Sequence, residues 1–306
     1  MMLNIMSLLI LLIIVLVGVA FLTLLERKVL GYVQNRKGPN KVGIMGIFQP
    51  FSDALKLLSK ELFIILKSNY NLYYLSPIMS LTFMLMMWLM YPFITNIYFL
   101  NYSMLIMIIL MTLGSYMLIF MGWSSNSIYS LMGSIRSVSQ MLSYEVSFIL
   151  IILILMIMSE SYSFIDFWKF QLYVWYVVIL NPLFIMFFIS ILAELNRTPM
   201  DFIEGESELV SGFNIEYFSG GFTLIFLAEY GMIIFFSFMM MMMFMNLNFL
   251  FNFMFINFFC SLVIFMRGLL PRMRYDELMY LCWKIILPLI LMYSFFIIGI
   301  KFLIVI

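Results

Sequence analysis

The chain has 306 residues, of which 65% are apolar and only 10% are charged, and its mean hydropathy is +1.12. Soluble domains are about half apolar and about a quarter charged, so this composition excludes an ordinary water-soluble domain and predicts helices that face a bilayer. The formal net charge of +1 gives no support to nucleic-acid binding, which requires a basic patch or stripe.

Metal-binding and redox residues are scarce. Histidine, the usual side chain for proton transfer near neutral pH, is absent, and Cys260 and Cys282 are the only thiols. Two thiols are too few to hold an iron–sulfur cluster. We therefore expect that the chain carries no redox centre of its own and that any electron comes from another subunit.

A bilayer core requires about 20 apolar residues per helix, and runs of this length predict eight spanning helices. They cover approximately residues 3–25, 71–94, 101–122, 142–159, 173–193, 219–245, 249–266 and 283–306. The first run lacks the basic start and the cleavage site of a signal peptide, so we expect it to be retained as a span. The prediction is an all-α membrane protein with a single integral membrane domain over residues 1–306.

The basic residues are divided unevenly between the loops. Fourteen of the 16 Lys and Arg residues lie in or beside the loops after the first, third, fifth and seventh predicted spans, and the exceptions are Lys169 and Lys301. By the positive-inside rule these loops face the matrix or cytoplasm, and both termini face the other side.

The first loop contains a second kind of helix signal. Three charged residues fall at positions i, i+3 and i+7, and apolar residues form a separate stripe. The charged residues are Asp53, Lys56 and Lys60, and the apolar ones are Phe51, Leu55, Leu58 and Leu62. This spacing predicts an amphipathic helix at the membrane interface, either as part of a binding cleft or as a surface anchor only.

A polar stripe leads into the fourth predicted span. Arg136, Gln140 and Tyr144 are four residues apart and share one helical face, and Glu145 follows them. Because a charge facing lipid costs several kcal/mol, we expect this stripe to face a hydrated cavity or partner helices.

The fifth loop gives the strongest local signal, because six acidic residues accompany Arg197. They are Glu194, Asp201, Glu204, Glu206, Glu208 and Glu216. Mutual repulsion and burial should raise the pKa of some of these carboxyl groups, which could then hold and pass protons near neutral pH. The alternative is a solvated acidic loop that docks a basic partner.

Glu229 is predicted to lie inside the sixth span rather than at either of its ends. An intramembrane carboxylate indicates a functional site, although a buried acid paired with a neighbouring helix is the alternative. The seventh loop, residues 271–279, mixes both signs, and Arg274 could simply pair with Asp276 or Glu277.

These motifs resemble one family in order along nearly the whole chain. The strings are Glu26-Arg27-Lys28, Arg36-Lys37-Gly38-Pro39-Asn40, Gly122 to Ser127, Ser143 to Ser147, Glu194 to Tyr217, Ala228-Glu229-Tyr230 and Arg272 to Met279. They are similar to the chain 1 family of NADH:ubiquinone oxidoreductase, respiratory complex I. The most specific string is Glu-Gly-Glu-Ser-Glu-Leu-Val-Ser-Gly-Phe-Asn. The bias toward Met, Phe and Tyr, with only four Ala, is typical of an A/T-rich genome such as an insect mitochondrion's.

The resemblance implies an eight-helix subunit of the mitochondrial inner membrane, with its charged loops in the matrix. Such a subunit lines the ubiquinone cavity and couples quinone reduction by NADH-derived electrons to proton translocation. The implied partners are other complex I subunits of the membrane arm and of the peripheral quinone site, together with lipid but no nucleic acid. FMN and iron–sulfur clusters would be in partner subunits only, with ubiquinone as substrate.

The resemblance also implies roles for individual residues. By position, Arg27, Arg36, Phe226 and Arg274 resemble quinone-cavity residues. The proton path would consist of Glu145, Glu194, Asp201, Glu204, Glu206, Glu208, Glu216 and Glu229. Arg197, with Arg274, resembles the counter-charge of these acids.

Two other functions are compatible with the pattern. Buried acids also mark secondary transporters and proton channels that act alone, although the inverted repeats of many transporters are not found in this sequence. The second alternative is a structural membrane anchor for a soluble redox module, which would tolerate the loss of its buried carboxylates.

Overall fold

The computed structural model describes residues 2–61, 63, 65–92, 100–171, 174–202, 212–246 and 249–305, and the regular structure in these ranges is helical. Seven helices there are long and apolar enough to cross a membrane. These are Ile5–Val33, Tyr70–Met90, Ser103–Ser124, Ile128–Ser159, Ser219–Phe244, Phe251–Leu269 and Tyr275–Leu303. The predicted all-α membrane fold is therefore confirmed.

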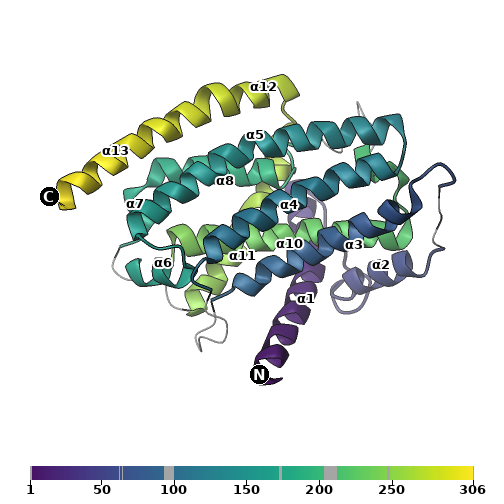
Figure 1. The fold of residues 1–306 in the computed structure, drawn as a ribbon. Helices are drawn as coiled ribbons and strands as arrows, with labels where there is room; N and C mark the ends of the chain where they lie inside the picture. The colour runs from purple at the N-terminus through teal and green to yellow at the C-terminus, as the bar shows by residue number, and fades with distance from the viewer. Residues whose placement is uncertain are drawn as a thin grey trace.

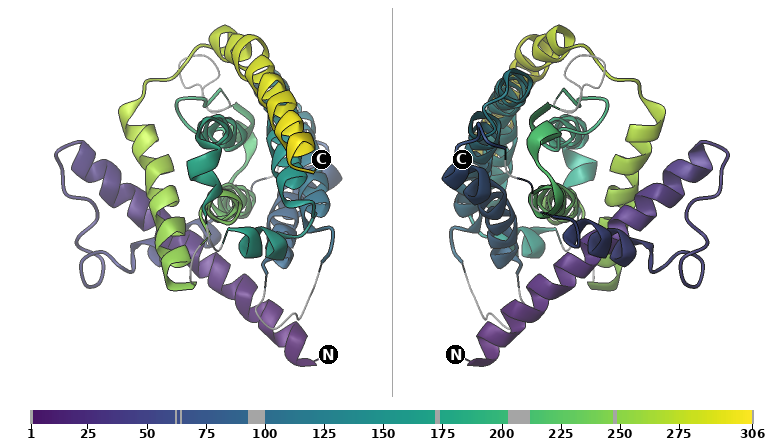
Figure 2. Two further views of the ribbon diagram at one scale, coloured as in Figure 1. Left: turned by 90° about the vertical axis from the view of Figure 1, so that its left-hand side faces the viewer. Right: turned by 90° about the vertical axis from the view of Figure 1, so that its right-hand side faces the viewer.

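The helices pack side by side (Figure 1), and α1 runs obliquely past the others with its N-terminus projecting (Figure 2). Contacts join α3 to α4 and α10, α5 to α4, α8 and α13, and α11 to α1 and α10. The longer elements are α1 (Met2–Val33), α3 (Tyr70–Met87), α4 (Ser103–Ser124), α5 (Ile128–Ser159), α8 (Asn181–Glu194), α10 (Ser219–Phe244), α11 (Phe249–Leu269) and α13 (Leu287–Val305). The shorter ones are α2 (Gln49–Leu58), η1 (Trp88–Met90), α6 (Phe164–Phe170), α7 (Tyr176–Ile179), η2 (Gly212–Glu216), α12 (Tyr275–Tyr280) and the π-helical turn η3 (Leu281–Ile286).

The remaining predicted span, residues 173–193, is divided into α7 and α8. The break is at Leu180, and Pro182 lies in the first turn of α8, where its missing amide is tolerated. Because α8 has 14 residues, it is about 21 Å long and shorter than a bilayer core of about 30 Å. Its last turn, from Ile191 to Glu194, is buried among the other helices.

Some helices continue beyond the predicted apolar runs. Helix α5 begins at Ile128, where Ser127 caps it by accepting a hydrogen bond from the Ser130 amide, although the apolar run begins near residue 142. An apolar run marks the part of a helix that suits lipid, whereas the helix can extend further where its polar residues are buried against neighbours. Gln140 is buried in this extension, and Tyr144 is buried just inside the predicted span.

The predicted amphipathic helix is confirmed as α2, which ends at Leu58, before Lys60 and Leu62. Its Asp53 carboxylate accepts hydrogen bonds from Arg27 of α1 at 2.5 Å and from Gln49 at 2.9 Å. Apolar residues on its other side are exposed, among them Phe51, Leu55 and Leu58. A polar side against α1 and an outward apolar side suit a helix that lies in the membrane interface.

The C-terminal end of α10 is capped by a side chain from another segment. The Gln171 amide nitrogen donates to the carbonyls of Met242 and Met243 at 3.0 and 2.9 Å, and its oxygen accepts from the Asn246 amide at 3.0 Å. Helix-end carbonyls that lack an intrahelical partner are costly where water is excluded. Gln171 therefore satisfies the backbone at the end of this long apolar helix.

The two lysines outside the basic loops both have acidic partners. Lys169 lies 3.0 Å from Asp166 on α6, and Lys301 on α13 lies 2.7 Å from Glu160, the residue after α5. The hydrogen bond and charge of Lys301 lower the pKa of Glu160, and a hydrogen bond from Ser163, followed by Lys169, lowers the pKa of Asp166. Because each of these lysines is paired with a carboxylate, neither adds net positive charge outside the basic loops.

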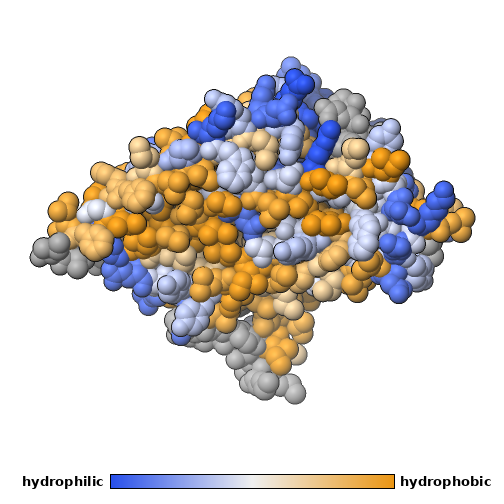
Figure 3. Space-filling view, turned by 45° about the horizontal axis from the view of Figure 1, so that its top comes forward, coloured by the Kyte–Doolittle hydropathy of each residue, from blue (hydrophilic) through white to orange (hydrophobic). Residues whose placement is uncertain are grey.

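Hydrophobic residues form a broad band on the face seen in Figure 3, and hydrophilic residues gather along its upper edge and at its right end. The band agrees with the exposure of large apolar side chains on α1, α11 and α13, such as Ile14, Phe253 and Phe295. A surface of this kind suits lipid rather than water as the solvent.

We predict that Lys301→Met loosens the contact between α13 and α5. Lys301 also donates to the Ile157 carbonyl, so the substitution removes two inter-helix contacts. Hydrogen exchange should become faster in the last turns of both helices. Because the folded pKa of Glu160 is lowered, this protection should be present above the ordinary glutamate range and lost only as pH falls through the lowered pKa.

Lys169→Met is the matched control, since Lys169 pairs with Asp166 on its own helix. It should leave exchange in α13 unchanged. Equal exchange changes in α13 for the two variants would contradict a specific role of Lys301.

Candidate functional site

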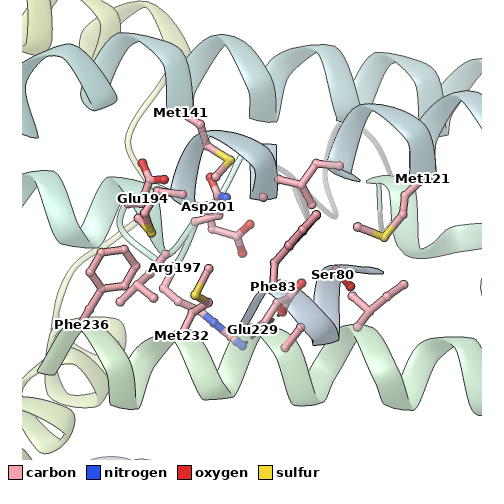
Figure 4. Close-up of a pocket in the computed structure, with 17 residues that line it drawn as sticks. Ser80, Phe83, Met121, Met141, Glu194, Arg197, Asp201, Glu229, Met232 and Phe236 are labelled. Atoms are coloured by element: carbon pink, nitrogen blue, oxygen red, sulfur yellow. Dashed lines mark hydrogen bonds and ion pairs between the residues drawn. The ribbon is translucent and has the colours of Figure 1, made fainter. Parts of the chain in front are cut away.

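A pocket of about 900 Å³, including its open mouth, lies between α3, α4, α5, α8 and α10. Most of its wall is apolar, as with Phe83, Met121 and Phe236 (Figure 4). Four charged residues also line it, and they are Glu194, Arg197, Asp201 and Glu229. All four are residues that the sequence analysis assigned to the proton path or to its counter-charge.

An ion pair joins two parts of the pocket wall, the segment after α8 and helix α10. Arg197 lies 3.3 Å from Glu229 of α10, and its guanidinium stands 4.7 Å from the centre of the Tyr230 ring. The chain turns away from α8 after Glu194, and Asn196 adopts a left-handed conformation with φ of 49°. This turn directs the Arg197 side chain toward α10, as Figure 4 shows.

Asp201 connects the pocket to the segment before α12. Its carboxylate lies 3.7 Å from Arg272, and the Met273 amide donates to the Pro199 carbonyl at 2.9 Å. Asp201 is 6% exposed, whereas a third of the Arg272 side chain remains accessible, so only the carboxylate is largely removed from water. The segment that follows α8 is therefore tied to the seventh predicted loop.

Two acids, the buried Glu194 of α8 and the half-buried Glu145 of α5, lie near enough to influence each other's charge. Glu194 is buried, and its charge interacts with that of Glu145 on α5. Within the part of the chain that the structure describes, Glu194 Oε2 and Glu145 Oε1 are buried and have no hydrogen-bond partner. Buried carboxyl oxygens require a proton or an ordered water, so this pair suits proton storage.

An aromatic stack fixes the start of α10. The rings of Tyr73 and Tyr217 are parallel, with centroids 4.5 Å apart, and the Tyr73 hydroxyl donates to the Glu216 carbonyl at 2.5 Å. The Tyr217 hydroxyl lies within 3.2 Å of Ser76 and Ser124. Burial raises the pKa of Tyr217, although these hydrogen bonds oppose the shift. Glu216 thus lies outside the pocket wall but on an anchored segment.

The acidic residues Glu204, Glu206 and Glu208 lie outside the described residues.

The structure places the four residues predicted for the quinone cavity outside the described lining of this pocket. Arg27 pairs with Asp53, and Arg36 is exposed in the turn after α1. Phe226 contacts Phe222 and Tyr230 on its own helix, with centroids 4.3 and 6.0 Å apart. Arg274 lies 3.8 Å from Asp276, and both side chains are 80% exposed. None of the four is among the described residues that line the pocket.

Three residues that the sequence analysis did not assign to the site extend the charged network. The Tyr230 hydroxyl donates to Glu26 of α1 at 2.5 Å, and Arg267 of α11 also pairs with Glu26. The contacts therefore run from Arg267 through Glu26 and Tyr230 to Arg197 and Glu229. Glu26 and Tyr230 are 204 positions apart in sequence, so no spacing rule could find this contact.

The comparisons with known proteins agree on one family. The NADH dehydrogenase family profile matches residues 6–298. The chain is 52% identical to NADH-ubiquinone oxidoreductase chain 1 of Aedes aegypti, over 96% of this chain and 94% of the relative. The corresponding protein of Locusta migratoria is 52% identical, over 97% of this chain and 95% of its own. That of Apis mellifera ligustica is 48% identical, over 96% and 97%.

The agreement covers nearly the full length of both this chain and its relatives, and it confirms the family predicted from the motifs. The chain belongs to the NADH-ubiquinone oxidoreductase chain 1 family.

Proposed function

We propose that this chain is the quinone-site membrane subunit of mitochondrial complex I and that it couples ubiquinone reduction to proton translocation through the charged residues of the pocket. The observation that carries the proposal is the gathering of Glu194, Arg197, Asp201 and Glu229 at one pocket within an otherwise apolar helical body. Ionisable groups at membrane depth are costly, and they mark ion or proton pathways by default.

The proton path would begin with the acids that border the pocket. Glu145 and Glu194 interact across α5 and α8, Glu229 pairs with Arg197, and Asp201 pairs with Arg272. A proton that binds one carboxylate weakens its ion pair and changes the field at the others. Such a set can pass a charge change along the membrane without moving the backbone far.

Quinone chemistry would supply that charge change. Reduction of ubiquinone to the quinol adds electrons, which create negative charge, and it consumes protons that neutralise this charge. Electrons would reach the quinone from NADH through FMN and iron–sulfur clusters in partner subunits. This chain's own residues would form the cavity wall and hold protons at the carboxyl oxygens of Glu194 and Glu229.

The network through Tyr230 offers a route for electrostatic signals from α1. Tyr230 lies between the Glu26 carboxylate and the Arg197 guanidinium, and Arg27 is the next residue after Glu26. We propose that the quinone cavity adjoins this end of α1, with Arg27, Arg36, Phe226 and Arg274 along it. A negative charge there would act on Arg197 through the Glu26 and Tyr230 contacts.

The basic loops would face the matrix and carry the docking surface for peripheral-arm subunits. Arg36, Lys37 and Arg274 are exposed there and available for such contacts. Membrane-arm subunits would cover part of the apolar surface of the helices. A purely structural anchor is the competing function, and it differs in predicting that the pocket carboxylates are dispensable.

We predict that Glu229→Gln in the assembled complex lowers ubiquinone-linked proton translocation by about tenfold, because the pocket loses one titratable group and the charge partner of Arg197. NADH oxidation by a water-soluble acceptor that reacts upstream of this subunit should be unchanged. Proton uptake and NADH consumption in sealed vesicles give both rates.

Asp166→Asn is the control for Glu229→Gln, since Asp166 also pairs with a cation but lies on α6, away from the pocket. It should translocate protons at the wild-type rate. Unchanged translocation per electron in Glu229→Gln would remove the proposed coupling and favour the anchor.

We also predict that Arg197→Gln harms assembly more than the double variant Arg197→Gln/Glu229→Gln. Removing one partner of a buried ion pair leaves a charge without its counter-ion, at a cost of about 3–5 kcal/mol. Glu229 is 29% exposed, so solvent reduces the expected cost to about 1–3 kcal/mol. Thermal melting of the complex measures this difference, and additive losses in the double variant would contradict the pairing.

A further inference from the structure

Gln140 of α5 holds two separate points of the segment after α8. Its amide nitrogen donates to the Ala193 carbonyl at 2.9 Å and to the Met200 carbonyl at 2.8 Å. The side chain is completely buried. One neutral side chain is therefore hydrogen-bonded to both ends of the segment 193–200, which contains Glu194 and Arg197.

The partners of Gln140 define the orientation of its amide. Both contacted atoms are carbonyl oxygens, which accept hydrogen bonds, so the amide group must present its nitrogen to them. An apolar residue would leave both contacts unmade. A carboxylate would place negative charge against two carbonyl oxygens and close to Glu194.

The segment 193–200 has little regular structure after α8 ends at Glu194. Among the described residues, its internal backbone hydrogen bonds run from Asn196 to Ala193 at 3.2 Å and from Met200 to Arg197 at 2.8 Å. On its outer side, Met273 bonds to Pro199, and Arg272 pairs with Asp201, the residue after the segment. Gln140 supplies the inner tie from α5, so the segment is held from two directions.

We propose that Gln140 is a positioning residue that sets the geometry of the charged pocket by fixing the segment 193–200 against α5. The proposal rests on the proposed function of the pocket. Gln140 is not among the described residues that line the pocket, and its neutral amide carries no exchangeable charge. By holding the backbone on both sides of Glu194 and Arg197, it sets the separation of these side chains from Glu229, and that separation governs their electrostatic coupling.

Gln171 provides a matched comparison within the same chain. It is similarly buried, at 1% exposed, and its amide nitrogen also donates to two backbone carbonyls, those of Met242 and Met243. The Gln171 contacts are at the C-terminal end of α10, which ends at Phe244. The pocket residues of α10 lie earlier, between Ile225 and Phe236. The two glutamines share their chemistry and differ in location.

The test compares Gln140→Met with Gln171→Met in the assembled complex. Met keeps the side-chain length and removes the donors, so both variants should lower the melting temperature of the complex. Only Gln140→Met should also lower ubiquinone-linked proton translocation, by about tenfold, and shift its pH profile. The charged groups that contribute to this profile are Glu194 and Arg197 on the held segment and, next to it, Glu145, Asp201, Glu229 and Arg272.

Gln140→Glu keeps the proposal testable if Gln140→Met fails to assemble. When protonated, the introduced carboxyl group can donate one hydrogen bond, whereas the charged carboxylate can donate none. The rate of this variant relative to wild type should therefore rise as pH falls. No such rise, or equal shifts in the pH profiles of Gln140→Met and Gln171→Met, would overturn the positioning role.

The outcomes separate the two proposals. If Glu229→Gln reduces coupling while Gln140→Met behaves like Gln171→Met, only the positioning role fails. If Glu229→Gln leaves coupling unchanged, the function proposed for the pocket fails, whatever the Gln140 variants do.

Discussion

The ion pair between Arg197 and Glu229 is the interaction on which the rest of the pocket depends. It brings the segment after α8 onto α10 and places a cation over the Tyr230 ring. Tyr230 in turn donates a hydrogen bond to Glu26, which also pairs with Arg267. Three helices and one loop thus meet around a few charges that would be unstable if any of them faced lipid.

The apolar surroundings of these charges strengthen the electrostatic interactions between them. Interactions between charges weaken strongly in water and persist where water is excluded, so a protonation change at one buried carboxyl is felt at its neighbours. Glu194 is 9% exposed and Asp201 is 6% exposed, whereas Arg274 and Asp276 are 80% exposed. The buried groups are therefore suited to transmit an electrostatic change, and the exposed ones to contact water or partner subunits.

The sequence predicted the class of fold and all four of the pocket's charged residues, but not their connections. Apolar runs located the spans because lipid requires continuous apolar length. They could not reveal the break at Leu180 or the early start of α5 at Ile128, where polar residues are buried by other helices. Arg197 was assigned as a counter-charge by resemblance, but its pairing with Glu229 and the contact between Glu26 and Tyr230 depend on tertiary packing.

The central claim is that carboxyl groups at this pocket change protonation when ubiquinone is reduced. Redox-difference infrared spectroscopy of the assembled complex tests it directly, because a protonated carboxyl has a carbonyl stretch that a carboxylate lacks. We predict a change in this band on quinone reduction that diminishes in Glu229→Gln. Identical carboxyl bands in the oxidised and reduced states, or a band change that the substitution leaves intact, would contradict the account.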